Sequence, residues 1–228
     1  MWTALVPRHV ASSMSWHPLP AVAIAVALIV AVSLADAGDR WITVHDGYGT
    51  VGVEVTDAGE HVRFLAPAVA ERSDHTHAAL VATARSYRDV RVSARMRTVR
   101  QLRRGDAPNP WEAGWLVWHY QDDQHFYYLI LKPNGWEVGK RDPAYPGGQR
   151  FLASGTAPAF DIAAWQHVRV VQVGTHMAIW VNGRRLATYT DTSAPYRRGR
   201  VALYTEDAHA QFAGVDIAPL DRPERRVR

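Results

Sequence analysis

The chain has 228 residues, no cysteine, 47% hydrophobic residues and a formal net charge of +4. The hydrophobic fraction excludes an intrinsically disordered chain, and the lack of cysteine excludes a disulfide scaffold or a cysteine-rich zinc site. Only two of the 26 basic residues are lysines, Lys132 and Lys140, and the small surplus of positive charge is spread along the chain. This gives too weak a field for a nucleic-acid partner.

An apolar run near the start of the chain predicts export. Residues 21–34 carry no charge, follow Arg8 and His17, and precede Ala35-Asp36-Ala37. A basic segment, an apolar core of this length and a small-x-small site are typical of a secretory signal peptide. We therefore predict a signal peptide over 1–37, a secreted protein and no membrane span after cleavage. An uncleaved N-terminal membrane anchor is the alternative, although the run is shorter than the roughly 20 residues of a spanning helix.

The remaining chain is predicted to form a single β-sandwich domain over 38–220 and a disordered basic tail over 221–228. Met14 is an alternative start to Met1. No window of twelve residues after the signal keeps the helical period of 3.6, whereas segments with a period of two recur between turn residues. In 89–98, for example, Val90, Val92, Ala94 and Met96 alternate with polar residues.

About a dozen short strands are expected, which suits an all-β, two-sheet antiparallel β-sandwich or jelly roll. In chain order the predicted strands are 49–55, 61–67, 78–84, 89–98, 114–120, 125–132, 136–141, 149–153, 166–173, 176–182, 185–190, 200–205 and 211–218. Pro133-Asn134-Gly135 and Asn182-Gly183 are strong hairpin signals, because Asn and Gly tolerate positive φ.

Eight aromatic residues lie in the two consecutive hairpins between Trp111 and Trp136. With 121–124 as the first loop, Tyr120 faces His125, and Trp118 faces Tyr127. With 133–135 as the second loop, Lys132 faces Trp136. Because side chains alternate across a sheet, this register separates the residues of the hairpins into two faces.

The more apolar set is expected to lie between the sheets, with Glu137 at its edge; it comprises Leu116, Trp118, Tyr120, Tyr127, Leu129 and Leu131. The other set is expected on the open face; it comprises Trp115, Val117, His119, Phe126, Tyr128, Ile130, Lys132, Trp136, Val138 and Lys140. A polar row of His119, Tyr128 and Lys140 between aromatic rings suits a sugar, which presents C–H groups to rings and hydroxyls to polar groups. The predicted ligand contacts are Trp115, His119, Tyr128, Lys132, Trp136 and Lys140. The alternative is that these rings have a structural role and pack under a loop.

Two catalytic chemistries remain open. Glu112 and Glu137 could meet across neighbouring strands as the two carboxyls of a glycoside hydrolase, although no acidic motif of a retaining enzyme occurs. His119 and Tyr128 could move protons in a polysaccharide lyase acting on uronic acid polymers, with Lys140, Gln149 or Arg150 neutralising the carboxylate. No cofactor is required by the sequence.

The sequence contains few residue patterns that indicate a metal site. His75-Thr76-His77 places two imidazoles on one side of a strand, but no third zinc ligand is evident. One structural calcium ion is a minority expectation, with Asp216 as a weak candidate ligand.

Five segments carry a resemblance to a known superfamily: Gly114–Trp118, Phe126–Leu131, Trp165–Val170, Ile179–Arg184 and Gly199–Tyr204. The stretch from Trp115 to Ile217 resembles the concanavalin A-like lectin/glucanase superfamily. It looks most like the laminin G-like domains and the domain of 3-keto-disaccharide hydrolase-like and family 16-type bacterial proteins. The resemblance implies a jelly roll whose concave sheet binds carbohydrate, but not catalysis, because the acidic motif of the glucanases is absent.

The leading hypothesis is therefore an exported carbohydrate-binding or carbohydrate-processing sandwich that holds a poly- or oligosaccharide on its concave sheet. The alternatives are a polysaccharide lyase or glycoside hydrolase of the same fold, and a cell-surface protein-interaction domain. We expect a monomer.

Overall fold

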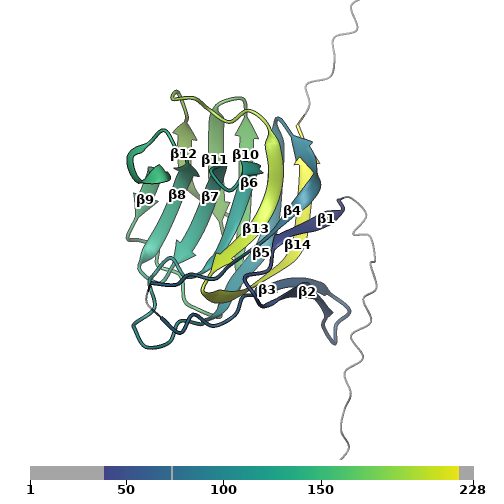
Figure 1. Cartoon of the computed structure of the whole chain (residues 1–228). Coiled ribbons are helices and arrows are strands. Elements are labelled where there is room, and N and C mark those ends of the chain that lie inside the picture. Colours follow the sequence, from purple (N-terminus) through teal and green to yellow (C-terminus); the bar gives the residue numbers. More distant parts are fainter. Residues whose placement is uncertain (1–38, 73, 221–228) are drawn as a thin grey trace, which may run out of the picture. The chain divides into compact units, whose positions relative to one another are not determined.

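The computed structural model describes residues 39–72 and 74–220; the predicted signal peptide and basic tail lie outside them. The described chain forms two antiparallel sheets of seven strands each, with one short 3-10 helix, η1 (Pro146–Gly148) (Figure 1). The predicted fold class, a two-sheet β-sandwich, is confirmed. Within these ranges the structure contains no helix with the length and hydropathy needed to cross a membrane.

Each sheet is built from strands that are distant in sequence. Sheet A has the strand order β1 (Trp41–His45), β4 (Ala78–Tyr87), β13 (Gly199–Glu206), β6 (Gly114–Asp122), β7 (His125–Lys132), β8 (Gly135–Arg141), β9 (Gln149–Gly155). Sheet B has the order β12 (Arg184–Thr190), β11 (His176–Val181), β10 (Gln166–Val173), β5 (Val90–Gln101), β14 (Ala208–Pro219), β3 (His61–Ala66), β2 (Thr50–Val55). The chain crosses between the sheets repeatedly, as in a jelly roll.

The core lies between the two sheets and follows the alternation of the strands. On β5, Val90, Val92, Ala94 and Met96 are buried, whereas the arginines between them are more exposed. Leu116, Trp118 and the inward residues of β7 pack against them from sheet A. Burial of apolar area at about 25 cal/mol per Å² is the main stabilising contribution to a domain without disulfides.

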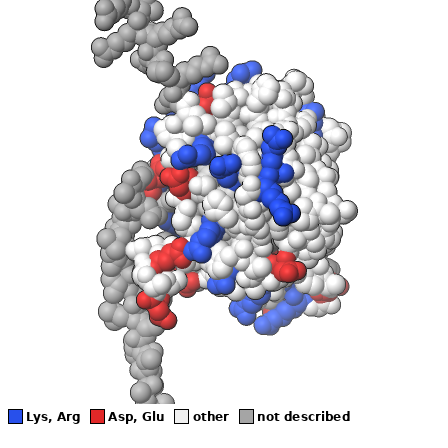
Figure 2. Space-filling view, turned by 180° about the vertical axis from the view of Figure 1, so that it is seen from behind, with Lys and Arg blue, Asp and Glu red and all other residues white. Residues whose placement is uncertain are grey.

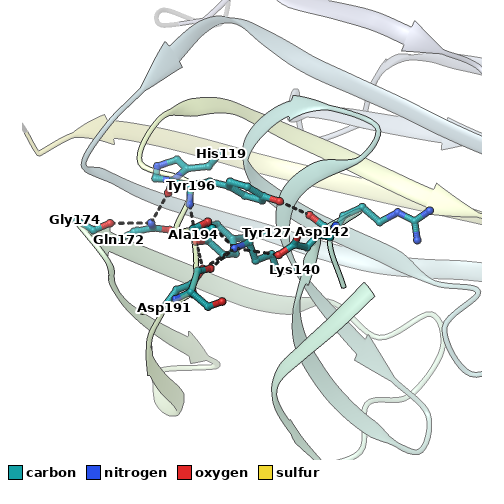
Figure 3. Close-up of polar contacts among 12 residues, drawn as sticks. His119, Tyr127, Lys140, Asp142, Gln172, Gly174, Asp191, Ala194 and Tyr196 are labelled. Carbon is teal, nitrogen blue, oxygen red and sulfur yellow. Dashed lines mark hydrogen bonds and ion pairs between the residues drawn. The ribbon is translucent and has the colours of Figure 1, made fainter. Parts of the chain in front are cut away.

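A buried lysine, Lys140, lies in this core. The Lys140 ammonium donates to the Asp191 carboxylate (3.0 Å) and to the carbonyls of Ser193 and Ala194 (2.8 and 2.7 Å), and lies 4.4 Å from the centre of the Tyr196 ring (Figure 3). The hydroxyl of Tyr127 donates to the same carboxylate at 2.6 Å. Burial alone would raise the pKa of Asp191, but these donors hold it below its usual range. Lys140 thereby fixes the segment 191–196 to sheet A.

The outer face of sheet B carries arginines that have partners. Arg91 pairs with Asp216 (3.0 Å) and Arg95 pairs with Glu60. Arg95 and Arg97 both lie over the ring of Trp165. In the view from behind, basic side chains lie in separate groups, several with acidic side chains beside them (Figure 2).

We expect Lys140→Met to destabilise the protein by about 3–5 kcal/mol, because it leaves the buried Asp191 carboxylate without its cation. The free energy of unfolding in urea measures the loss. Lys140→Met combined with Asp191→Asn should cost less than the sum of the single changes, since the two side chains interact.

The control is Lys132→Met, which removes the only other lysine of the chain and should destabilise the protein less, because the Lys132 side chain is partly exposed. Equal losses for the two lysines would contradict a special role for Lys140.

Candidate functional site

The turn between β7 and β8 decides which side chains reach the outer face of sheet A. Lys132 pairs with Gly135, so the loop has two residues, Pro133 and Asn134, and not the three expected from the sequence. The predicted facing of Lys132 and Trp136 is therefore wrong by one residue. A shift of one residue turns every side chain of a strand to the opposite face.

This shift corrects four predicted positions on β8. Trp136 and Lys140 point into the core between the sheets and not onto the open face. Val138, expected on the open face, also lies in the core. Glu137, expected at the edge of the core, points instead to the outer face, where it contacts Tyr128.

A bulge in β6 corrects a second part of the prediction. Trp118 pairs with Tyr127 as expected, but the next pair is Asp122 with His125, so three residues stand opposite Phe126. His119 has a positive φ of 49° within this bulge. The bulge turns Tyr120 to the outer face and places it in the ring cluster with Phe126.

His119 consequently lies inside the protein. Its ring nitrogens are each 2.7 Å from a backbone carbonyl oxygen, one of Tyr196 and one of Arg88, and the ring lies beside Tyr127 (Figure 3). Burial lowers the pKa of His119. His119, Tyr128 and Lys140 therefore do not share the expected row, and neither His119 nor Lys140 faces the surface that carries Tyr128.

The outer face of sheet A has an aromatic layer. Trp115 lies at the centre, 4.9 Å from the ring of Tyr128 and 5.0 Å from the ring of Tyr204. Phe126 and Tyr120 extend the layer along the strands. Trp115, Val117, Phe126, Tyr128 and Ile130 lie on this face as the sequence predicts. The rings of Trp115, Phe126, Tyr120 and Tyr128 are themselves buried; they pack on one another, and the guanidinium of Arg200 lies over the ring of Tyr120.

A polar cluster centred on Glu137 adjoins the rings. The Tyr128 hydroxyl donates to Glu137 Oε1 (2.7 Å), and the Lys132 ammonium donates to Oε2 (3.0 Å). Gln149 Nε2 donates to the Tyr128 hydroxyl (2.5 Å) and contacts Glu137 Oε1 (3.3 Å). Burial, together with the Glu137 charge, raises the pKa of Tyr128, so Tyr128 acts here as a hydrogen-bond donor and not as a base.

The place of Tyr128 depends on a glycine on the neighbouring strand. Gly139 pairs with Tyr128, and a Cβ at Gly139 would lie 2.0 Å from the hydroxyl oxygen and 2.1 Å from Cζ of the tyrosine. Only a residue without a side chain lets the ring lie across β8 toward Glu137.

The other predicted functional residues have structural partners. Glu112 is buried and accepts from Arg103 (2.6 Å) and Asn109 (2.8 Å). Asp216 is exposed and pairs with Arg91. His77 lies with Nδ1 3.0 Å from the carbonyl of Ala68, and His75 is exposed. In 39–72 and 74–220 no group of three or more His, Asp or Glu side chains is arranged to hold a metal ion.

The sequence interpretation missed several residues of this face. Glu206 accepts from the Tyr204 hydroxyl (2.6 Å), and burial raises the pKa of Glu206. Arg141 follows Glu137 and Gly139 on the same side of β8. Phe151 is 62% exposed and pairs with Gly139, and Trp111 is 45% exposed next to Trp115. With the correct turn length, the alternation of side chains along β8 would have placed Arg141 on the outer face. The position of Glu206 cannot be inferred without knowing that β13 pairs with β6.

Solved structures with this architecture include three carbohydrate-related proteins. The carbohydrate-binding module CBM66 from Bacillus subtilis is 18% identical, with 78% of this chain and 94% of that chain covered and a TM-score of 0.54. A Bacillus licheniformis β-glucanase is 10% identical (79% and 92% covered, TM-score 0.51). The exoplasmic/lumenal domain of VIP36, bound to Ca²⁺ and Man3GlcNAc, is 11% identical (82% and 86% covered, TM-score 0.50). At these identities the likeness concerns the fold.

The protein is thus a two-sheet β-sandwich with the fold of a carbohydrate-binding module and a β-glucanase. Its sequence matches the 3-keto-alpha-glucoside-1,2-lyase-like domain over residues 31–218, and the chain belongs to this family. No curated protein matches the chain.

Gly139→Ala should destabilise the protein by about 1–3 kcal/mol, because the added methyl group overlaps the Tyr128 ring. Urea unfolding of Gly139→Ala, Tyr128→Ala and the double variant measures the coupling. We expect the glycine substitution to cost much less when Tyr128 is already alanine; additive costs would refute the close packing of the two residues.

Glu206→Gln should stabilise the protein at pH 8 but not at pH 4. Because burial raises its pKa, Glu206 keeps its proton in the folded state at pH values where the unfolded chain has released it. Its contribution to stability is therefore full below the ordinary value of 4.5 and falls as the pH rises through the folded pKa. Urea unfolding at both pH values tests this, with the exposed Glu71→Gln as control. A pH-independent difference would contradict burial of the carboxyl.

Proposed function

We propose that the protein binds a poly- or oligosaccharide on the outer face of sheet A. The observation that carries this proposal is the polar cluster of Glu137, Tyr128, Lys132 and Gln149 on a layer of aromatic rings. A sugar needs both components, since its hydroxyls require donors and acceptors and its C–H face packs on rings.

Phe151 offers the accessible ring for stacking. It lies on β9, one strand from the Glu137 carboxylate on β8, and most of its side chain is exposed. An exposed large apolar side chain beside a polar cluster is typical of a ligand-binding surface. Trp115, Tyr128 and Lys132, three of the sequence-predicted ligand contacts, support the same face from β6 and β7. The family match and the likeness to a carbohydrate-binding module support the ligand class.

A glycan array probed with the purified protein tests the proposal. We expect Phe151→Ala and Glu137→Gln to weaken binding about tenfold or more, since each removes a main contact of the face. Tyr48→Ala is the matched control, because Tyr48 is also an exposed aromatic residue but contacts His77 and lies outside this face.

Binding that survives both changes would place the ligand elsewhere. Absence of binding to any glycan, by a protein whose folding is verified by circular dichroism, would overturn the proposal.

A catalytic role is the second candidate, favoured by Glu206. A partly buried carboxyl with a raised pKa can donate a proton to a leaving oxygen, and Glu137, held by donors on the same face, differs from it in environment. Incubation with uronate polymers and with 3-keto-glucosides, followed by ultraviolet absorbance and sugar analysis, tests this role. Product formation abolished by Glu206→Gln would support it, and lack of product from every substrate would count against it.

We also propose that the protein is exported by its N-terminal segment 1–37. The apolar run and the small-x-small site support this proposal. Cell fractionation with mass spectrometry of the mature N-terminus tests it, and a retained Met1 or Met14 in the membrane fraction would favour an anchor.

A further inference from the structure

Arg141 ends β8 on the outer face of sheet A. It pairs with Phe126 on β7 and with Gln149 on β9, both of which belong to this face. A Cβ at Gly148 would lie 3.4 Å from Cζ and Nη1 of Arg141, so the guanidinium lies against the backbone of the loop that follows β8. Its charge lowers the pKa of Tyr128, Tyr204 and Glu206, against the stronger effect of burial, which places it among these groups.

Arg141 is partly buried, yet no carboxylate of the described residues lies within ion-pair distance of its guanidinium, and its side chain makes no hydrogen bond to them. Five other described arginines pair with a carboxylate, and Arg200, on the same face, lies over the ring of Tyr120. Arg103, for instance, holds Glu112 and Asp207 at 2.6 Å. A cation that is partly removed from water is costly unless a counter-ion or several acceptors reach it.

The neighbouring acidic groups do not supply that counter-ion. Glu137 is occupied by Lys132, Tyr128 and Gln149. Burial raises the pKa of Glu206, and Tyr204 donates to its carboxyl group. Asp123 accepts from the hydroxyl of Tyr120. The guanidinium of Arg141 therefore has no acidic partner among the described residues, although it lies beside rings and a polar cluster.

We propose that Arg141 binds the carboxylate of an acidic sugar, so that the ligand of this face is a uronate-containing glycan. The inference rests on the proposed sugar-binding function. The planar fork of a guanidinium donates two parallel hydrogen bonds to a carboxylate, and a neutral hydroxymethyl group does not offer the two matching acceptor oxygens. Gln149 contacts the ring hydroxyls, and Phe151 packs on the C–H face of the sugar.

Matched pairs of oligosaccharides test the inference. The probes are oligomers of galacturonate, glucuronate and mannuronate, each as the free acid and as the methyl ester, titrated into the purified protein by calorimetry. At least one acid should bind about tenfold to a hundredfold more tightly than its ester. Arg141→Gln should remove this difference, and Arg141→Lys should keep part of it.

Arg150→Gln is the control, because Arg150 is the next arginine on the adjacent strand, pairs with the inward-facing Lys140, and so belongs to the opposite face. It should leave the preference for the acid unchanged. Urea unfolding of each variant verifies that the fold is retained.

The outcomes separate the inference from the proposed function. Equal binding of acid and ester, a preference that persists in Arg141→Gln, or binding of neutral glycans alone would overturn the role of Arg141 and leave the sugar-binding face standing. Failure of every glycan to bind would overturn both.

Discussion

The burial of Lys140 is the constraint on which the arrangement of the outer face depends. A lysine without exposed surface requires a partner, and Asp191 together with two carbonyl groups supplies it from the segment before β13. Because side chains alternate along a strand, the inward position of Lys140 turns Glu137, Gly139 and Arg141 outward. The pairing register of β8 thus determines both the ion pair inside the sandwich and the polar groups on its outer face.

On the outer face of sheet A, a glycine positions an aromatic ring, and the ring in turn positions polar groups. Gly139 lets the ring of Tyr128 lie across β8, and the ring brings its hydroxyl to Glu137. Trp115 packs against Tyr128 from β6 and against Tyr204 from the side of β13. Since the rings restrict the polar side chains above them, the donors around Glu137 are held in place before a ligand arrives, which lowers the entropic cost of binding.

The sequence predicts the sandwich, the alternation of β5 and the pairing of Trp118 with Tyr127, because hydrophobic periodicity and turn residues are local signals. Three features could not be predicted. Pro133-Asn134-Gly135 is compatible with a loop of two or of three residues, and the choice sets the face of every residue in β8. The bulge at His119 rests on a positive φ at a residue other than glycine, and the partner of Lys140 lies 51 residues away. The predicted face is therefore confirmed for Trp115, Tyr128 and Lys132 and wrong for His119, Trp136 and Lys140.

A comparison of the two outer faces indicates why sheet A is the better candidate for a ligand. On sheet B, Arg91 and Arg95 have carboxylate partners, Arg97 donates to Gln211, and Arg169 lies over the ring of Trp180. On sheet A the acidic groups accept hydrogen bonds from nearby donors. Arg141, in contrast, has no carboxylate partner among the described residues, and the ring of Phe151 is exposed. Because a half-buried guanidinium and an exposed ring both gain from a partner, an incoming anionic ring compound would lower the free energy of this face more than that of sheet B.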